Sequence, residues 1–141
     1  PDVLLVSIGA LANLALEVGA QAHREGVGVT VIDPRWVKPL PAALVNMAEG
    51  YKRVVVMEDG IRHGGIASTI SEMFRDAAIA IPIHSIGVPL TFIEHSKRSE
   101  IMEDLGITAQ HITRSVVEWS SSLMEGMQFP SDESADRRPL R

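Results

Sequence analysis

Acidic residues end two apolar runs of the sequence, and their type and position make them the first candidates for chemistry. Asp33 ends the run 27–33, and Glu58 with Asp59 follows the run 54–57. In a parallel sheet, strand carboxyl ends share one edge, where helix amino ends attract ligands and partners. Two such carboxylates facing each other would suit acid/base chemistry. The favoured interpretation is that they accept hydrogen bonds from backbone N–H groups of the following turns.

The turn after Asp59 contributes the other candidates. It holds Arg62 and His63, followed by Gly64 and Gly65 where a helical pattern begins. Consecutive glycines at a helix start indicate that the backbone comes close to a ligand, a neighbouring strand or another subunit. The interface or active-site-edge candidates are therefore Asp33, Arg35, Glu58, Asp59, Arg62, His63, Gly64 and Gly65.

The sequence lacks the residues that several kinds of chemistry require. The chain has no cysteine, and Ser68 lacks the flanking glycines of a nucleophile elbow. The five histidines show none of the spacings that place two metal ligands on one helix face. Neither phosphate-binding glycine motif, G-x-G-x-x-G or G-x-x-x-x-G-K-[ST], occurs. We therefore expect no catalytic, cofactor-binding or metal-binding residue in this chain.

The elements that must position the candidates follow from hydrophobic periodicity. Continuous apolar runs are typical of strands covered on both faces, and each run is followed by a pattern of helical period. This alternation predicts an α/β fold: a three-layer α/β/α sandwich with a mainly parallel sheet of about four strands. The expected strands are 3–9, 27–33, 53–58 and 82–87, and helices are expected at 11–25, 41–50, 64–78, 97–105 with Ser96 as N-cap, and 109–123 with Thr108 as N-cap.

Composition limits the class of protein. The 141 residues, 45% of them hydrophobic, suit one globular domain at 1–123, followed by a polar tail at 124–141 that we expect to be disordered. A net charge of −5 argues against a nucleic-acid surface, and no apolar run reaches the ~20 residues of a membrane span. We expect a cytoplasmic protein. Because a strand begins at once, we also expect a piece of a larger protein.

Four ordered segments carry a resemblance to a known family. Together they are similar to the C-terminal domain of actinobacterial 1-deoxy-D-xylulose-5-phosphate synthases, a domain shared with transketolases and 2-oxoacid dehydrogenase β-subunits. The resemblance covers about residues 2–123. Its segments are Asp33-Pro-Arg-Trp-Val-Lys-Pro-Leu40, Glu58-Asp-Gly-Ile-Arg-His-Gly-Gly-Ile-Ala-Ser68, Gly87-Val-Pro-Leu-Thr-Phe-Ile-Glu-His95 and Leu105-Gly-Ile-Thr108.

The resemblance implies a homodimeric transferase that condenses pyruvate with glyceraldehyde 3-phosphate, for isoprenoid, thiamine and pyridoxal precursors. Thiamine diphosphate and Mg²⁺ would be held by the remaining domains, so this fragment would bind neither and be inactive alone. Its role would be dimer packing and shaping the active-site surround. The family also implies strand order 2-1-3-4, with an antiparallel strand upstream. Pro41, Ala67 and Leu90 depart from frequent family residues.

Two alternatives stay open. The same domain occurs in transketolases and in 2-oxoacid dehydrogenase β-subunits, where it helps dimerisation or docks a partner. A free-standing flavodoxin-like binding module is the alternative from another class.

Overall fold

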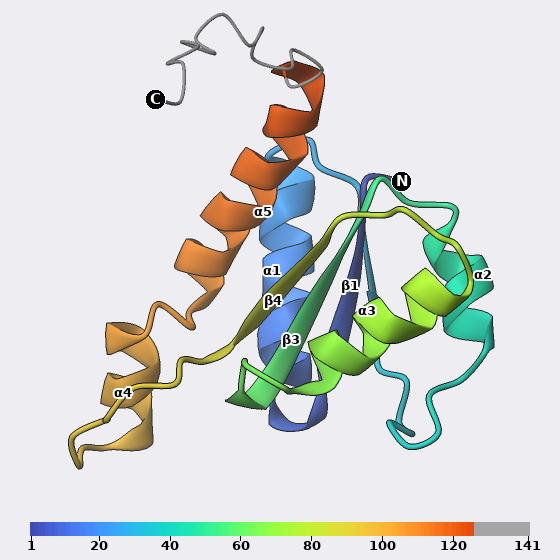
Figure 1. Ribbon diagram of the computed structural model, residues 1–141. Helices are drawn as coiled ribbons and strands as arrows, with labels where there is room; N and C mark the ends of the chain where they lie inside the picture. The colour runs from blue at the N-terminus through green and yellow to red at the C-terminus, as the bar shows by residue number, and fades with distance from the viewer. Residues whose placement is uncertain (126–141) are drawn as a thin grey trace, which may run out of the picture.

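The computed structural model describes residues 1–125, which form a parallel sheet between two layers of helices (Figure 1). The four strands lie in the order β2-β1-β3-β4, and every neighbouring pair is parallel. Both the predicted fold class and the predicted strand order are confirmed. The strands are β1 (Val3–Ile8), β2 (Val29–Ile32), β3 (Arg53–Ile61) and β4 (Ile83–Val88).

Helices cover both faces of this sheet. On one face α1 packs beside α5, and on the other lie α2 and α3, while α4 sits beyond the carboxyl end of β4 (Figure 1). No helix in residues 1–125 is long and apolar enough to cross a membrane. The helices are α1 (Ala12–Arg24, after the 3-10 turn Gly9–Leu11), α2 (Ala43–Ala48), α3 (Ile66–Asp76), α4 (Arg98–Asp104) and α5 (Ala109–Glu125).

Strand β1 shows why the first apolar run is continuous. Val3 and Leu5 face the core under α1 and α5, whereas Leu4 and Val6 face the core under α2 and α3. All four side chains are fully buried. Successive strand residues point to opposite faces, so a strand with helices on both sides needs apolar residues at every position.

Strand β3 runs three residues beyond its predicted end at 58. Its pairing with β4 shifts register between Met57 and Ile61, and Ile61 then pairs with Val88. Asp59, Gly60 and Ile61, which lie beyond the predicted end of the strand, are therefore part of it. A β-bulge of this kind redirects side chains, which periodicity alone does not reveal.

The predicted cap of α4 is wrong by one residue. The helix follows Lys97, whose N–H donates to Oε2 of Glu100 at 3.3 Å. The Ser96 hydroxyl donates to the same oxygen from one position earlier. Glu100 in the first turn therefore holds the helix start, which the Ser96 N-cap interpretation overlooked.

The last helix begins as predicted. Oγ1 of Thr108 accepts from the His111 N–H at 3.4 Å, so Thr108 is its N-cap. The helix continues to Glu125, two residues past the predicted domain end at 123. The rest of the predicted tail, 126–141, lies outside the described residues.

Candidate functional site at the carboxyl edge of the sheet

Glu58 connects the end of β3 to the start of α3. Its Oε2 accepts a hydrogen bond of 3.0 Å from the Ile66 N–H, and the residue is only 7% exposed. A carboxylate at a helix amino end satisfies an unpaired donor and meets the positive end of the helix dipole. Glu58 thus takes the capping role favoured from the sequence. Its other oxygen, Oε1, is buried without a hydrogen-bond partner among the described residues.

Glycines make room for this carboxylate. A Cβ at Gly65 would lie 2.5 Å from Cδ of Glu58, and one at Gly87 would lie 3.4 Å from Cγ of Glu58 and 3.0 Å from the Gly60 carbonyl oxygen. Gly64 has φ +72°, a conformation that L side chains rarely adopt. The close neighbour of Gly65 is therefore a carboxylate of the same chain, whereas Gly64 is required by its backbone conformation.

The other two candidate carboxylates also have partners within the chain. Oδ2 of Asp59 accepts from a guanidinium nitrogen of Arg98 at 2.9 Å, which ties β3 to the start of α4. Oδ1 of Asp33 accepts from the Arg35 N–H at 2.8 Å, which closes a turn with Arg35 at φ 59°.

The structure does not bring Asp33 and Glu58 together. Asp33 follows β2 and Glu58 lies in β3, and β1 lies between those strands. Strands are ~4.8 Å apart, so the two carboxylates belong to strands about 10 Å apart. The possible acid/base pair is therefore not formed.

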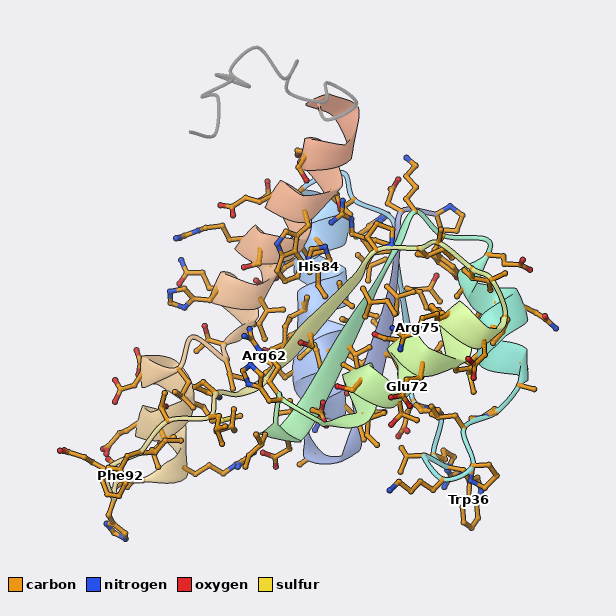
Figure 2. The ribbon with its side chains drawn as sticks, in the orientation of Figure 1. Trp36, Arg62, Glu72, Arg75, His84 and Phe92 are labelled. Carbon is orange, nitrogen blue, oxygen red and sulfur yellow. The ribbon has the colours of Figure 1, made fainter. Side chains whose placement is uncertain are left out.

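The three cationic candidates are exposed. Arg35, Arg62 and His63 lie in the turns after β2 and β3, and none forms a salt bridge with another residue in 1–125. Figure 2 labels Arg62 beside the carboxyl end of β4. These side chains are available for a partner, which is the role predicted for them.

Large apolar side chains project from the same edge, and the sequence interpretation missed them. The exposed fractions are 73% for Trp36 and 94% for Phe92, and Leu90 and Ile61 are also exposed. Figure 2 shows Trp36 and Phe92 pointing away from the body of the domain. For Trp36, Leu90 and Phe92 the signal in the sequence is position: large hydrophobic residues in proline-containing loops belong to no element's apolar stripe. We call Trp36, Ile61, Leu90 and Phe92 the edge surface.

A buried polar cluster lies at the opposite, amino end of the strands. Arg53 begins β3 and is 3% exposed, and its Nη1 lies 2.8 Å from Nε2 of His84 on β4. The His84 ring stacks on Trp119 of α5, with centroids 4.0 Å apart. Burial lowers the pKa of Arg53, and burial followed by the charge of Arg53 lowers the pKa of His84. No motif in the sequence predicts a role for His84.

The described residues do not suit thiamine diphosphate or its metal ion. No group of three or more His, Cys, Asp or Glu side chains in residues 1–125 is placed to hold a metal. The carboxylates at the sheet edge are engaged with α3, with Arg98 and with a backbone turn. Phosphate-cradling glycines are also missing, because the glycines around Glu58 make room for that carboxylate.

Comparison with known proteins agrees with the fold. Residues 1–112 match the family model described as the transketolase, C-terminal domain. The chain therefore belongs to the transketolase C-terminal domain family.

Two curated relatives of this chain are 1-deoxy-D-xylulose-5-phosphate synthases. The chain is 41% identical over all 141 residues to 1-deoxy-D-xylulose-5-phosphate synthase 2 of Streptomyces avermitilis, covering 22% of that protein. It is 44% identical over 122 residues, 86% of the chain, to 1-deoxy-D-xylulose-5-phosphate synthase of Rhodococcus jostii, covering 19% of that protein. The chain thus spans about a fifth of the length of these curated relatives.

A solved structure supports the architecture. The match is to a split-gene transketolase, described as an inactive beta4 tetramer, with a TM-score of 0.77 and 28% identity. It covers 85% of this chain and 39% of that one. A flavodoxin-like domain from Synechococcus, covering 85% of this chain and 99% of its own, reaches only a TM-score of 0.45 at 13% identity, a likeness too weak to argue from.

Proposed function

We propose that this chain is the C-terminal domain of a thiamine-diphosphate-dependent 1-deoxy-D-xylulose-5-phosphate synthase. The enzyme joins pyruvate to glyceraldehyde 3-phosphate and releases carbon dioxide. The observation that carries the proposal is the 41% identity along the whole chain to the synthase of Streptomyces avermitilis. The enzyme is a cytoplasmic homodimer whose remaining domains hold thiamine diphosphate and Mg²⁺.

The domain's contribution is packing at the carboxyl edge of its sheet. The edge surface presents Trp36 and Phe92, and aromatic side chains of this size are frequent anchors of interfaces. The cation Arg35, which forms no salt bridge within residues 1–125, lies at the same edge and supplies polar contacts around those anchors. The partner is the remainder of the synthase, in the same subunit or in the second copy.

The activity is tested with the complete synthase polypeptide that contains this chain. With thiamine diphosphate and Mg²⁺ it should convert pyruvate and glyceraldehyde 3-phosphate into 1-deoxy-D-xylulose 5-phosphate with one carbon dioxide per product. The 141-residue chain alone should be inactive, because its described residues offer no cofactor site. Turnover by the isolated chain would contradict the proposal that the remaining domains hold the cofactor.

The same assay separates the family alternatives. A transketolase or a 2-oxoacid dehydrogenase β-subunit with this domain would not form deoxyxylulose phosphate efficiently. Absence of that product from a folded, cofactor-loaded complete protein would therefore overturn the synthase assignment and leave the family membership intact.

A further inference from the structure

A hollow of about 200 Å³ lies against β4, the edge strand of the sheet. Strand β4 forms one wall, and the segment from the end of α4 into α5 forms the other. The polar side chains that line it are Arg62, Ser85, His111 and Ser115. Sites for drug-sized ligands usually exceed ~300 Å³, so the occupant must be small.

The polar groups of this lining favour an anion over a cation. It contains a guanidinium, an imidazole and two hydroxyls, but no carboxylate, although the chain has 18 acidic residues against 13 Lys and Arg. The hollow between α1 and α5 is lined by two arginines and two glutamates, so its charges balance. A third hollow beside α4 includes Glu94 and Asp104. Of these three, the hollow at β4 is the one suited to an anion.

Its donors are available to a ligand. Arg62 forms no salt bridge within residues 1–125. The hydroxyl of Thr108 lies 3.0 Å from Nδ1 of His111, which leaves Nε2 of that ring for another partner. A guanidinium presents several N–H groups in a rigid fork that matches phosphate oxygens.

The remaining lining is apolar. Ile86, Leu105 and the ring of Trp119 flank the polar groups, so a short carbon skeleton attached to the anion would find apolar contacts. We propose that this hollow, lined by Arg62, Ser85, His111 and Ser115, binds the phosphate of a small phosphate monoester. The phosphate meets Arg62 and the two hydroxyls, and the carbon skeleton lies against Trp119. The site is independent of the proposed enzyme activity, because it needs neither thiamine diphosphate nor the other domains.

Trp119 provides the readout. In a Trp36→Phe background of the 141-residue chain, Trp119 is the single tryptophan. Titration with glycerol 3-phosphate should change its fluorescence saturably, with a Kd of about 1 mM or below, as suits a ligand of few atoms. Inorganic phosphate should bind more weakly, and acetate should not compete. Equal binding of acetate would show a general anion site and overturn the phosphate assignment.

Matched variants test which side chains of the hollow bind the phosphate. Arg62→Gln should raise the Kd for glycerol 3-phosphate at least tenfold, and Ser115→Ala should raise it severalfold. Arg75→Gln, an exposed arginine of α3 on the other face of the sheet, removes the same charge and should leave the Kd unchanged. Circular dichroism checks that each variant folds, and Ser115→Ala carries the test if Arg62→Gln does not.

Three further results would overturn the proposal: no saturable change up to ~20 mM ligand, more than tenfold above the expected Kd; the same change with KCl at equal ionic strength; or equal Kd values for Arg62→Gln and Arg75→Gln. The first shows that the hollow is empty of phosphate esters. The other two results would show that the fluorescence responds to ionic screening of the whole surface and not to binding at this hollow.

Discussion

Nη1 of Arg53 lies 2.8 Å from Nε2 of His84, and this contact determines which imidazole nitrogen carries the proton. A guanidinium can only donate, so Nε2 accepts and the proton of the neutral ring is on Nδ1. The neutral ring stacks on Trp119 with an interplanar angle of 13°. Arg53, His84 and Trp119 thereby connect β3, β4 and α5.

The first prediction is a loss of stability in mild acid. Burial and the charge of Arg53 lower the folded-state pKa of His84 below its ordinary value of 6.5. The neutral ring therefore contributes stability that is fully present above about pH 6.5 and is lost as the pH falls through the folded pKa. Between pH 7.5 and 5.5, the free energy of unfolding in urea should fall more for the natural chain than for His84→Gln.

The control for this comparison is His95→Gln, because His95 is exposed in the loop before α4. It should reproduce the pH dependence of the natural chain. Equal pH dependence of the natural chain and His84→Gln would show that His84 does not couple folding to pH.

The second prediction concerns the space beside Glu58. Gly65→Ala places a methyl group 2.5 Å from the carboxyl carbon of Glu58, so the carboxylate must leave its position on α3. We expect a loss of about 1–3 kcal/mol in unfolding free energy, as for other overpacked sites. Because the clash is with that side chain, most of the loss should disappear when Gly65→Ala is made in a Glu58→Ala background.

Gly64→Ala is the matched control for the second prediction. Nothing lies within 4 Å of its added Cβ, but the residue has φ +72°. Its cost of about 1–2 kcal/mol is backbone strain, and should be the same with or without Glu58. If Gly65→Ala also behaved identically in both backgrounds, the carboxylate would not be the group that requires glycine.

The third prediction is that the edge surface contributes to assembly of the complete enzyme and not to folding of the isolated chain. Trp36→Ser and Phe92→Ser remove side chains that are largely exposed in this domain, so each should change the unfolding free energy of the 141-residue chain by no more than about 0.5 kcal/mol. In the complete synthase the same changes should lower Tm and increase proteolysis between domains, because buried aromatic anchors are lost.

Leu16→Ser serves as the comparison for the edge surface. Leu16 is 60% exposed on α1 and does not belong to the edge surface, so Leu16→Ser should affect neither the isolated chain nor the complete enzyme. A complete enzyme indifferent to Trp36→Ser and Phe92→Ser would place the interdomain contact elsewhere.

The sequence predicts most of the fold because its signals are local. The runs at Val3 and Val54 are apolar at every position, which matches strands buried on both faces, and Thr108 caps α5 as its side chain predicts. The bulge in β3 is different, since it depends on pairing with β4. Capping of α4 through Glu100 is local, but it was missed because Ser96 is a more usual N-cap residue than Lys97.

The candidate site is only partly predictable for a related reason. Residue type and position place Glu58 at the right edge and suggest capping, but its neighbour Gly87 comes from a different strand. The sequence offers no local mark that His84 is enclosed by Arg53 and Trp119, since these residues lie far apart along the chain. Such contacts are set by the tertiary fold.

The central position of β1 has a consequence for how the chain acquires its structure. Val3 pairs with Val29 on one side and with Arg53 on the other, so every strand pairing of β1 is non-local. Closing those long loops costs chain entropy before any contact compensates for it, and such topologies fold slowly. During synthesis, β1 must wait for β3 to leave the ribosome, and until then its four wholly apolar residues are a target for chaperones.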